Sequence, residues 1–527
     1  MNKIVKKNTG SFYTCQSVAD YVAKWAIRGK HNKVLEPSFG DGSFVLAANK
    51  RFKQLKNNSP CLYGVEIQKK PYNDMNKRKL LAKSFCQDFI SFATEEKFDA
   101  VIGNPPYIRL RRLKAKQREK TLKLMHSYNF KINPNSSLWL PFIIHSTELL
   151  DQGGRLGMVL PYEITYVRYA FDLWSYLGAN FNNIKLIRVY KDFFPDVDVE
   201  TIILLADGKG GKSDNVEYNI YNQLSDLFLE KPFKKTKVKI ADILGMKKPF
   251  EKQLLSSSLL KTLSKRIQDK TLIPITNICK FKIGYIDGNK EYFHPNEEEI
   301  KKYKLRKKNL LPSMINTKSI SSQKSNGLST SRYKTSDTLF YPTIIKKGEK
   351  AYIELGEKDK VNEGYKCRQR KPWYLTPGLE TPDVILTVFS ETPKLLLNDG
   401  KYIVSNSLLS GKIKGIANKE FICRWYNSLT LLLTEINVHS LGGGTLVIIP
   451  GEIDCLNIVS KIPKNKIEKV FTQINELSKT SNLEDVYKLG DEIVLKDIFK
   501  YTDKEIRQIR KGIETLRKWR QPKERRG

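Results

Sequence analysis

Cysteine and histidine are scarce in this chain of 527 residues, which has seven cysteines and five histidines. The cysteines are scattered without a Cys-x-x-Cys pair, which argues against a disulfide framework and against a zinc site. The histidines show no metal-ligand spacing, and none belongs to a Ser/His/Asp series with a nucleophile elbow. We therefore predict no bound metal.

Long apolar runs are also missing. No signal-like apolar stretch opens the sequence, and no run reaches the ~18 residues needed to cross a bilayer. We therefore expect a cytoplasmic protein without a membrane partner.

Acidic residues are too few to balance the basic ones. The chain has 56 Asp and Glu against 92 Lys and Arg, a formal net charge of +36. Such an excess is expected of a protein that binds a polyanion. A lysine-rich composition of the kind that an AT-rich genome produces accounts for part of it. Because charge alone does not separate DNA from RNA, the nature of the partner has to come from motifs.

The most informative motif is Asn104-Pro105-Pro106-Tyr107, which directly follows the strand-like apolar run 98–103. The two prolines lack N–H groups and have a fixed φ, so the turn is stiff and presents carbonyl groups. A planar amine can donate to the Asn104 side-chain oxygen and the Pro105 carbonyl while it stacks on Tyr107. The motif therefore favours chemistry on a planar amine, although Pro-Pro also occurs in ordinary strand-ending turns.

Three further strand-end segments precede this motif. Residues 34–44 indicate a strand, a glycine-bearing turn and a helix start, which lets a ligand approach backbone N–H groups. The strand-like run 62–67 carries Glu66 near its end, where an acid typically holds a ribose diol. Asp88 and Phe89 offer an acid and an aromatic ring to an adenine. Each segment alone is common, but the ordered series favours a ligand with a ribose and an adenine.

These segments together resemble the gamma class of S-adenosylmethionine-dependent adenine-N6 DNA methyltransferases, found in type II restriction–modification systems. Residues 10–14 resemble the family's N-terminal cofactor-binding segment, and residues 153–161 its later turn-and-strand segment. Phe193-Phe194-Pro195 resembles the aromatic segment that packs against a flipped base. One departure is Phe39, which stands in the cofactor loop where many relatives carry a smaller residue.

The resemblance implies an α/β fold with a mainly parallel, seven-stranded methyltransferase sheet flanked by helices, and a C-terminal α+β domain that recognises the DNA target. It implies S-adenosylmethionine as the cofactor and methyl transfer to N6 of an adenine flipped out of duplex DNA. The implied catalytic residues are Asn104, Pro105, Pro106, Tyr107 and Phe194. The implied cofactor-binding residues are Phe12, Tyr13, Thr14, Glu36, Pro37, Ser38, Gly40, Gly42, Glu66, Asp88, Phe89, Asn104 and Pro106.

Basic residues concentrate just after the amine-binding motif, between residues 109 and 118, where we expect a phosphate backbone to pass. In the second half, residues 367–374 interleave basic and aromatic side chains, which suits phosphate neutralisation combined with base or sugar contact. A buried Trp–Tyr pair with surface arginines is the competing interpretation. The predicted DNA-binding residues are Arg109, Arg111, Arg112, Arg368, Arg370 and Trp373.

Two domains are expected, because single hydrophobic cores rarely grow beyond about 250–300 residues. Residues 1–243 carry every cofactor and catalytic motif, and we predict that residues 244–527 form the DNA target-recognition domain. Near the end of the chain, Thr502-Asp503 can cap a helix with apolar residues at helical spacing. The basic face of that helix is a secondary candidate for phosphate contact.

Alternative functions remain at this point. An RNA base methyltransferase is the closest in chemistry, a protein-glutamine methyltransferase uses the same Asn-Pro-Pro-Tyr motif, and a non-catalytic DNA-binding subunit could share the fold. No nuclease-like carboxylate–Lys cluster is apparent downstream, and residues 1–9 leave little room upstream of the first motif. We therefore expect a monomer that acts on double-stranded DNA, with any cognate restriction endonuclease acting as a separate protein.

Overall fold

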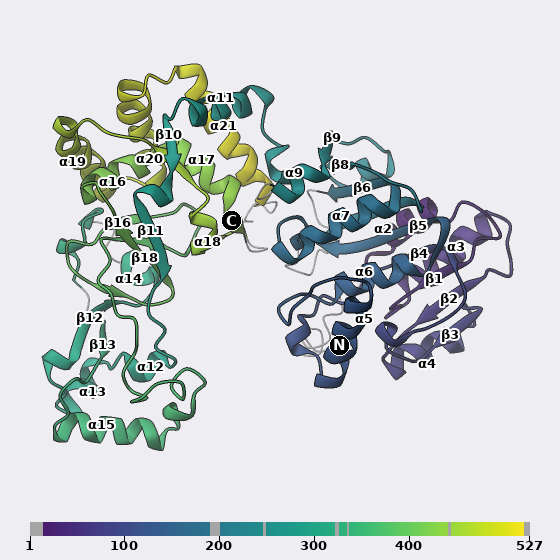
Figure 1. The fold of residues 1–527 in the computed structure, drawn as a ribbon, viewed down its shortest axis with the longest axis horizontal. Helices are drawn as coiled ribbons and strands as arrows, with labels where there is room; N and C mark the ends of the chain where they lie inside the picture. The colour runs from purple at the N-terminus through teal and green to yellow at the C-terminus, as the bar shows by residue number, and fades with distance from the viewer. Residues whose placement is uncertain are drawn as a thin grey trace. The chain divides into compact units, whose positions relative to one another are not determined.

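The computed structural model describes residues 14–189, 201–245, 249–321, 326–334, 337–440 and 444–520. The chain forms two compact units; the first extends to Gln253 and the second begins at Leu254 (Figure 1). In the described ranges, no helix has both the length and the apolar character that crossing a bilayer requires.

A nine-stranded sheet forms the centre of the first unit, with the strand order β3-β2-β1-β4-β5-β7-β6-β8-β9. Strands β1 to β5 pair in parallel, and β7 is antiparallel to both of its neighbours. The strands are β1 Val34–Glu36, β2 Leu62–Val65, β3 Lys83–Phe85, β4 Phe98–Gly103, β5 Leu150–Pro161, β6 Phe181–Val189, β7 Thr201–Lys209, β8 Asn215–Tyr221 and β9 Lys234–Lys239.

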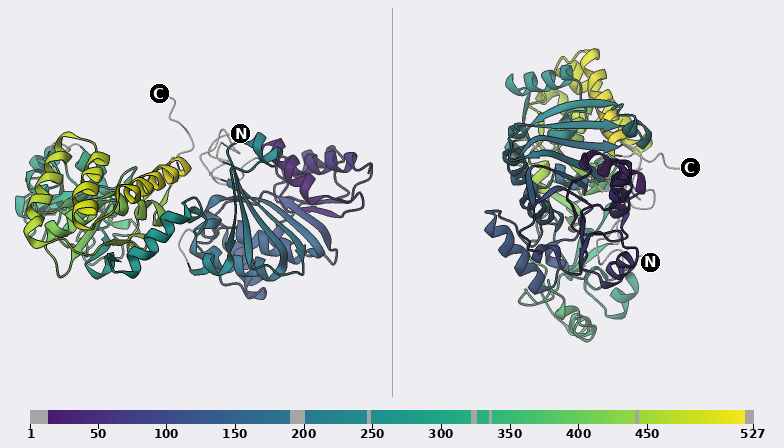
Figure 2. Two further views of the ribbon diagram at one scale, coloured as in Figure 1. Left: turned by 90° about the horizontal axis from the view of Figure 1, so that it is seen from above. Right: turned by 90° about the vertical axis from the view of Figure 1, so that its right-hand side faces the viewer.

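The central strands read as continuous apolar runs because helices cover both faces of the sheet. Figure 2 shows helices on either side of it. On one face, α2, α3 and α8 contribute to a single apolar core with the strands. Two further helices pack on the sheet: α6 on β5, and α7 on β6 and β7. The helices are α2 Gln16–Ala26, α3 Ser43–Gln54, α4 Lys69–Lys77, α5 Ala115–Ser127, α6 Trp139–Glu148, α7 Phe171–Asn180, α8 Leu224–Phe228, α9 Ile240–Gly245 and α10 Pro249–Lys252.

The predicted α/β sheet is present, but the expected count of seven strands is wrong. Strand β8 pairs in parallel with β6 and in antiparallel with β9, which extends the sheet by two strands. Gly153 and Gly154, expected in a turn, lie inside β5. A register shift between β4 and β5, next to Phe98, accommodates the extra residues of β5.

The second unit is α+β, as predicted, and has two separate apolar cores. The larger core combines a four-stranded sheet, β11-β18-β14-β16, with helices from the C-terminal part. The main strands are β11 Cys279–Ile283, β12 Leu310–Met314, β13 Thr338–Phe340, β14 Val384–Thr387, β16 Leu395–Leu397 and β18 Leu408–Ile413. The main helices are α11 Ser257–Gln268, α15 Lys347–Lys358, α16 Asn418–Trp425, α17 Ser428–Asn437, α19 Lys464–Thr480, α20 Leu483–Gly490 and α21 Asp503–Arg520.

The predicted C-terminal helix α21 begins as expected. The backbone N–H of Glu505 donates to the Thr502 hydroxyl, and the Glu505 carboxylate accepts from the Thr502 backbone in return. Its basic residues divide into two groups. Arg517 and Arg520 both donate to the buried Glu435, whereas Arg507, Lys511 and Lys518 are exposed. Arg525 and Arg526, which follow this helix and add to the predicted basic surface, lie outside the described residues.

Candidate active site

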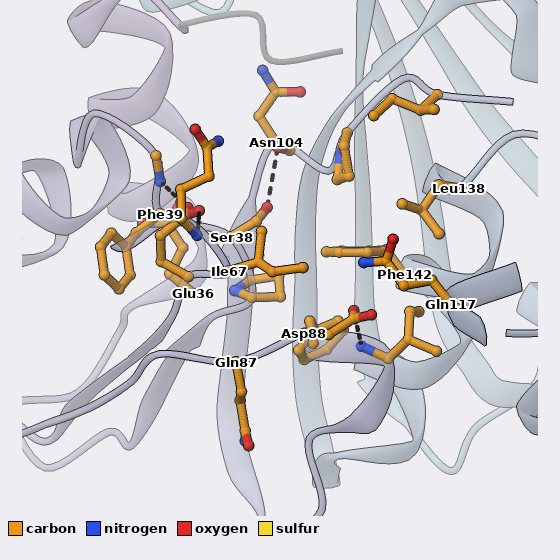
Figure 3. Close-up of a pocket in the computed structure, with 18 of the residues that line it drawn as sticks. Glu36, Ser38, Phe39, Ile67, Gln87, Asp88, Asn104, Gln117, Leu138 and Phe142 are labelled. Carbon is orange, nitrogen blue, oxygen red and sulfur yellow. Dashed lines mark hydrogen bonds between the residues drawn. The ribbon is translucent and has the colours of Figure 1, made fainter. Parts of the chain in front are cut away.

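A cavity of about 340 Å³ lies in the first unit, where β1, β2 and β4 end. The carboxyl ends of parallel strands meet at one edge of a sheet, so the predicted strand-end residues come together there. Figure 3 shows Asn104 near the top of this pocket and Asp88 and Gln87 near the bottom. The predicted residues that line it are Thr14, Glu36, Pro37, Ser38, Gly40, Glu66, Asp88, Phe89, Asn104 and Pro106.

Several predicted site residues are not part of that lining, among them Pro105 and Tyr107. Phe12 and Tyr13, assigned to the cofactor, and Phe194, assigned to the flipped base, lie outside the described residues. Gly42 is described but does not line the cavity; it is the N-cap of α3 and has a φ of +85°. Its left-handed conformation lets the loop turn sharply into the helix, which carries Ser43 to the pocket wall.

Phe39, the residue that departs from the family pattern, fits because of a glycine on the next strand. Its side chain is 2% exposed and forms part of the pocket wall. A Cβ atom placed on Gly64 of β2 would lie 2.8 Å from the Phe39 ring. The missing side chain at Gly64 therefore provides the space for the larger residue in the cofactor loop.

Glu66 ties the cofactor loop to the end of β2. One carboxyl oxygen accepts from the Gly40 backbone N–H over 2.9 Å, and the other accepts from the Gln68 backbone N–H over 2.7 Å. Burial raises the pKa of Glu66, and these two backbone donors act in the opposite direction. Because a carboxylate has about four acceptor positions, Glu66 can still accept from a diol in the pocket.

Glu36, at the end of β1, is more deeply buried. It is 2% exposed, and its Oε2 has no hydrogen-bond partner among the described residues. Burial, followed by the nearby carboxylates of Asp41 and Glu66, raises the pKa of Glu36 well above its usual range. A buried acceptor of this kind calls for a ligand with donor groups or positive charge. The pocket residues therefore fit S-adenosylmethionine, whose ammonium and ribose hydroxyl groups are donors.

Aromatic rings line the other end of the pocket. Asp88 caps the 3₁₀ turn η1 (Phe89–Ser91) by accepting from the Ile90 backbone N–H over 3.1 Å. The Phe89 ring is 2% exposed and packs against Phe142 of α6, with ring centroids 4.9 Å apart. Both rings line the cavity. Phe142 was missed by the sequence analysis, because its apolar helix gave no indication of which side faces a ligand.

His145 supports this aromatic wall from behind. Its ring lies 4.8 Å from that of Phe89. Its Nε2 is 2.9 Å from the Phe92 carbonyl oxygen, so Nε2 is the protonated nitrogen, and Nδ1 is 2.9 Å from the Tyr128 hydroxyl. Burial lowers the pKa of His145, which favours this neutral form. The histidine is thus a fixed part of the wall, held by two hydrogen bonds.

The turn at residues 104–107, predicted to be catalytic, is held by three hydrogen bonds. Asn104 Nδ2 donates to the Thr14 hydroxyl over 3.1 Å. The Ser38 hydroxyl donates to the Asn104 carbonyl oxygen over 3.4 Å (Figure 3). The Tyr107 hydroxyl donates to the Val159 carbonyl oxygen of β5 over 3.2 Å. These contacts fix the amide and the ring at the edge of the cofactor pocket.

The basic residues after this turn differ in their surroundings. Arg111 and Arg112 are exposed, and Arg112 and Lys114 also line the pocket. Arg109 instead forms an ion pair with Glu163, with Nη2 2.7 Å from Oε2. The sequence suggested phosphate contact for all three arginines and gave no sign of Glu163, which no motif distinguishes.

In the second unit, the predicted basic–aromatic segment is partly internal. Arg370 donates to the Asp287 carbonyl oxygen over 2.8 Å, and Trp373 packs against Tyr292 with ring centroids 5.4 Å apart. Arg368 is exposed. The competing interpretation of packed aromatics therefore describes Trp373 well, and Arg368 keeps a surface position that suits DNA contact.

Metal and disulfide chemistry has no visible basis in the described ranges. They contain no cluster of three or more His, Cys, Asp or Glu side chains that could hold a metal ion. All seven cysteines are free thiols, of which Cys279, Cys367 and Cys423 are buried.

Two family models match the chain. Residues 23–194 match the model described as Eco57I restriction-modification methylase, and residues 247–495 match the model for the C-terminal domain of Type II methyltransferase M.Eco57I. The two matches lie one in each half of the chain.

Individual relatives agree with these matches. The chain is 24% identical over 409 residues to Type II methyltransferase M.AccI of Acinetobacter calcoaceticus. This match covers 73% of this chain and 72% of the relative. It is 24% identical over 456 residues to M.PaeR7I of Pseudomonas aeruginosa, covering 74% of each. The match to M.BstVI of Geobacillus stearothermophilus, at 27% identity, covers 30% of this chain and 34% of that relative.

Two solved structures resemble most of the chain. The Type IIL restriction-modification enzyme MmeI in complex with DNA gives a TM-score of 0.59 at 12% identity, over 96% of this chain and 75% of that one. The DrdV–DNA complex gives 0.52 at 11% identity, over 91% and 58%. At these identities the likeness concerns the fold.

Proposed function

We propose that this chain transfers a methyl group from S-adenosylmethionine to N6 of an adenine flipped out of duplex DNA. The matches of residues 23–194 and 247–495 to the two Eco57I methyltransferase models support this proposal. The same matches and the type II methyltransferase relatives support a DNA methyltransferase of the restriction–modification type. The adenine N6 target and the flipping of the base are the finer parts of the proposal. The observation that supports them most directly is the position of Asn104 at the edge of the cofactor pocket.

S-adenosylmethionine supplies a methyl group that its sulfonium already activates for transfer. Glu66 and Glu36 are the acids that would accept from its hydroxyl and ammonium groups. Asp88, with the Phe89 and Phe142 rings, would hold its adenine. This division uses the acceptors and the apolar walls at the two ends of the same cavity.

Asn104 is the residue that would act on the target amine. The N6 lone pair of adenine is delocalised into the ring, which makes it a poor nucleophile. Hydrogen bonds from N6–H to the Asn104 side-chain oxygen and the Pro105 carbonyl oxygen favour a nitrogen whose lone pair is available. These bonds strengthen as positive charge develops on nitrogen, so they stabilise the transition state more than the ground state.

Thr14 and Tyr107 prepare this arrangement. Because Asn104 Nδ2 is engaged with Thr14, the amide orientation is set before the substrate binds. Tyr107, whose hydroxyl is anchored to β5, would stack on the flipped base, and Phe194 would pack beside it. Preorganised groups of this kind reduce the reorganisation that the reaction needs.

DNA recognition is assigned mainly to the second unit. We propose that residues 254–521 read the target sequence, and that Arg111, Arg112 and Arg368 contact phosphates from exposed positions. We further propose that the chain acts as a monomer and that any cognate restriction endonuclease is a separate protein.

The test is methyl transfer to three substrates: duplex DNA, structured RNA and a glutamine-containing protein. After digestion of the DNA to nucleosides, N6-methyladenine is the expected product. Replacing Asn104 with Ala should lower the single-turnover rate by about 10²–10³, the usual cost of losing a preorganised catalytic hydrogen bond. Cofactor affinity, measured by calorimetry, should change far less.

Contrary outcomes are distinct. Methylation of RNA or protein without methylation of DNA would show that the substrate is not DNA. A methylated cytosine in the DNA digest would show that the target base is not adenine. A folded Asn104→Ala variant with a near-normal single-turnover rate would reject the mechanism.

A further inference from the structure

Glu163 lies at the centre of a compact polar network beside the catalytic turn. Its Oε2 accepts from Arg109 Nη2 over 2.7 Å, and its Oε1 accepts from Trp139 Nε1 and from the Tyr169 hydroxyl, each over 2.8 Å. Arg109 Nη1 donates to the same Tyr169 hydroxyl over 2.7 Å. The Glu163 side chain is 17% exposed. We call these four residues the Glu163 network.

The network joins the two segments that hold Tyr107. Arg109 follows Tyr107 by two residues, and Glu163 lies in η3 (Tyr162–Thr165), the turn that directly follows β5. The Tyr107 hydroxyl already donates to Val159 of β5. The catalytic turn and the end of β5 are therefore connected twice, once through the tyrosine and once through the Arg109–Glu163 ion pair.

The network also explains why Arg109 differs from its neighbours. Its guanidinium donates to Glu163, to Tyr169 and to the Asn135 carbonyl oxygen. The Arg109 side chain is 35% exposed, but a phosphate that drew its guanidinium away from Glu163 would leave a largely buried carboxylate without its counter-charge. Breaking a buried pair in this way is costly. Arg111 is exposed, so it can bind a phosphate without the loss of a buried ion pair.

We propose that Arg109 and Glu163 are positioning residues for methyl transfer, and that Arg109 does not contact DNA phosphate. Arg109 and Glu163 keep the turn that carries Asn104 and Tyr107 in register with the end of β5. Small displacements of reacting groups reduce rates strongly. This inference rests on the proposed function, because it concerns the rate of that reaction.

The experiment uses the full-length chain with Arg109→Gln, Glu163→Gln and the double variant. At saturating DNA and cofactor, each should lower the single-turnover rate by about ten- to hundredfold, while cofactor affinity stays near that of the wild type. The double variant should be no slower than the slower single variant, because both changes break the same contact. Arg109→Lys keeps the charge without the planar fork, so it should recover part of the rate and provides a milder change if Gln unfolds the turn.

The salt dependence of DNA binding separates positioning from phosphate contact. Losing one phosphate contact makes the slope of log K against log salt shallower by about 1. Arg109→Gln should leave this slope unchanged, whereas the exposed control Arg111→Gln should reduce it. A shallower slope for Arg109→Gln together with a wild-type single-turnover rate would overturn the inference. If the wild-type chain fails to methylate duplex DNA, the proposed function itself fails before any variant is compared.

Discussion

At the residue scale, Glu36 is the most deeply buried ionisable residue that lines the cofactor pocket. It is 2% exposed, it has Asp41 and Glu66 nearby, and its pKa is raised well above the usual range. The folded state therefore holds the Glu36 proton more tightly than the unfolded state does. Stability from this group is lost as the pH rises above the ordinary glutamate pKa of about 4.3. We infer that Glu36 is retained for ligand binding at a cost in stability.

Glu36→Gln tests this inference, because Gln cannot ionise. We expect the variant to be more stable than the wild type near pH 7 without cofactor, and to lose that advantage below about pH 4. Its affinity for S-adenosylmethionine should fall, because the anionic acceptor is gone. Urea unfolding at several pH values and calorimetric titration measure the two effects. Glu95→Gln, a change at an exposed acid, is the control; a pH-independent difference for Glu36→Gln would contradict the expectation.

The sequence predicted the residues that line the pocket better than it predicted which basic side chains are available for DNA contact. Glu36, Glu66, Asp88 and Asn104 end neighbouring strands or follow them, so sheet geometry brings them together. Arg109 gave no comparable signal. Its partner Glu163 is 54 residues away, and a charged residue in a sequence does not show whether it faces solvent or a buried acid.

At the scale of elements, two glycines with positive φ stand in different places: Gly42 in the turn from β1 into α3, and Gly153 inside β5. Gly42 has a φ of +85° and a Cβ there would lie 1.9 Å from Met75 Cε. Gly153 has a similar φ of +74°, with nothing within 4 Å of its missing Cβ. The two glycines share the backbone constraint and differ in their neighbourhood.

Gly42→Ala and Gly153→Ala are therefore a matched pair. Each should lower the free energy of unfolding by about 1–2 kcal/mol, the cost of a left-handed conformation for an L-residue. Only Gly42→Ala should also weaken cofactor binding, because Met75 must move and the start of α3 borders the pocket. Chemical denaturation and cofactor titration of both variants check this. Equal loss of cofactor affinity in the two would contradict a local role for Gly42.

Elements were predictable where apolar runs are continuous and less so at the lysine-rich edge of the sheet. The strands β1, β2 and β4 follow from buried runs. Further strands are expected up to about Ile243, but the pairing of β8 and β9 with the edge of this sheet did not follow, because β9 is mostly lysine and gives no apolar signal. An edge strand rich in lysine resembles a solvated segment in a sequence, yet lysines are a common protection of sheet edges.

For the molecule as a whole, the boundary between the units lies later than the sequence suggested. The predicted division after residue 243 precedes α10, which packs into the first unit. Phe250 is 0% exposed, and its ring lies 5.3 Å from Trp174 and 5.1 Å from Tyr218. The Tyr162 hydroxyl donates to Glu251 Oε1 over 2.7 Å. A lysine-rich connector in the sequence gave no indication of this buried turn.

Two fragments distinguish these boundaries. Residues 1–253 should fold and bind cofactor, whereas residues 1–243 should be less stable by about 3–5 kcal/mol, the usual cost of removing a buried Phe side chain. Urea unfolding followed by circular dichroism measures the difference. Both fragments should lose site-specific methylation, because the proposed recognition residues lie beyond Leu254. Equal stability of the two fragments would place the boundary at 243, and a 1–253 fragment with undiminished site selectivity would show that the first unit reads the DNA sequence by itself.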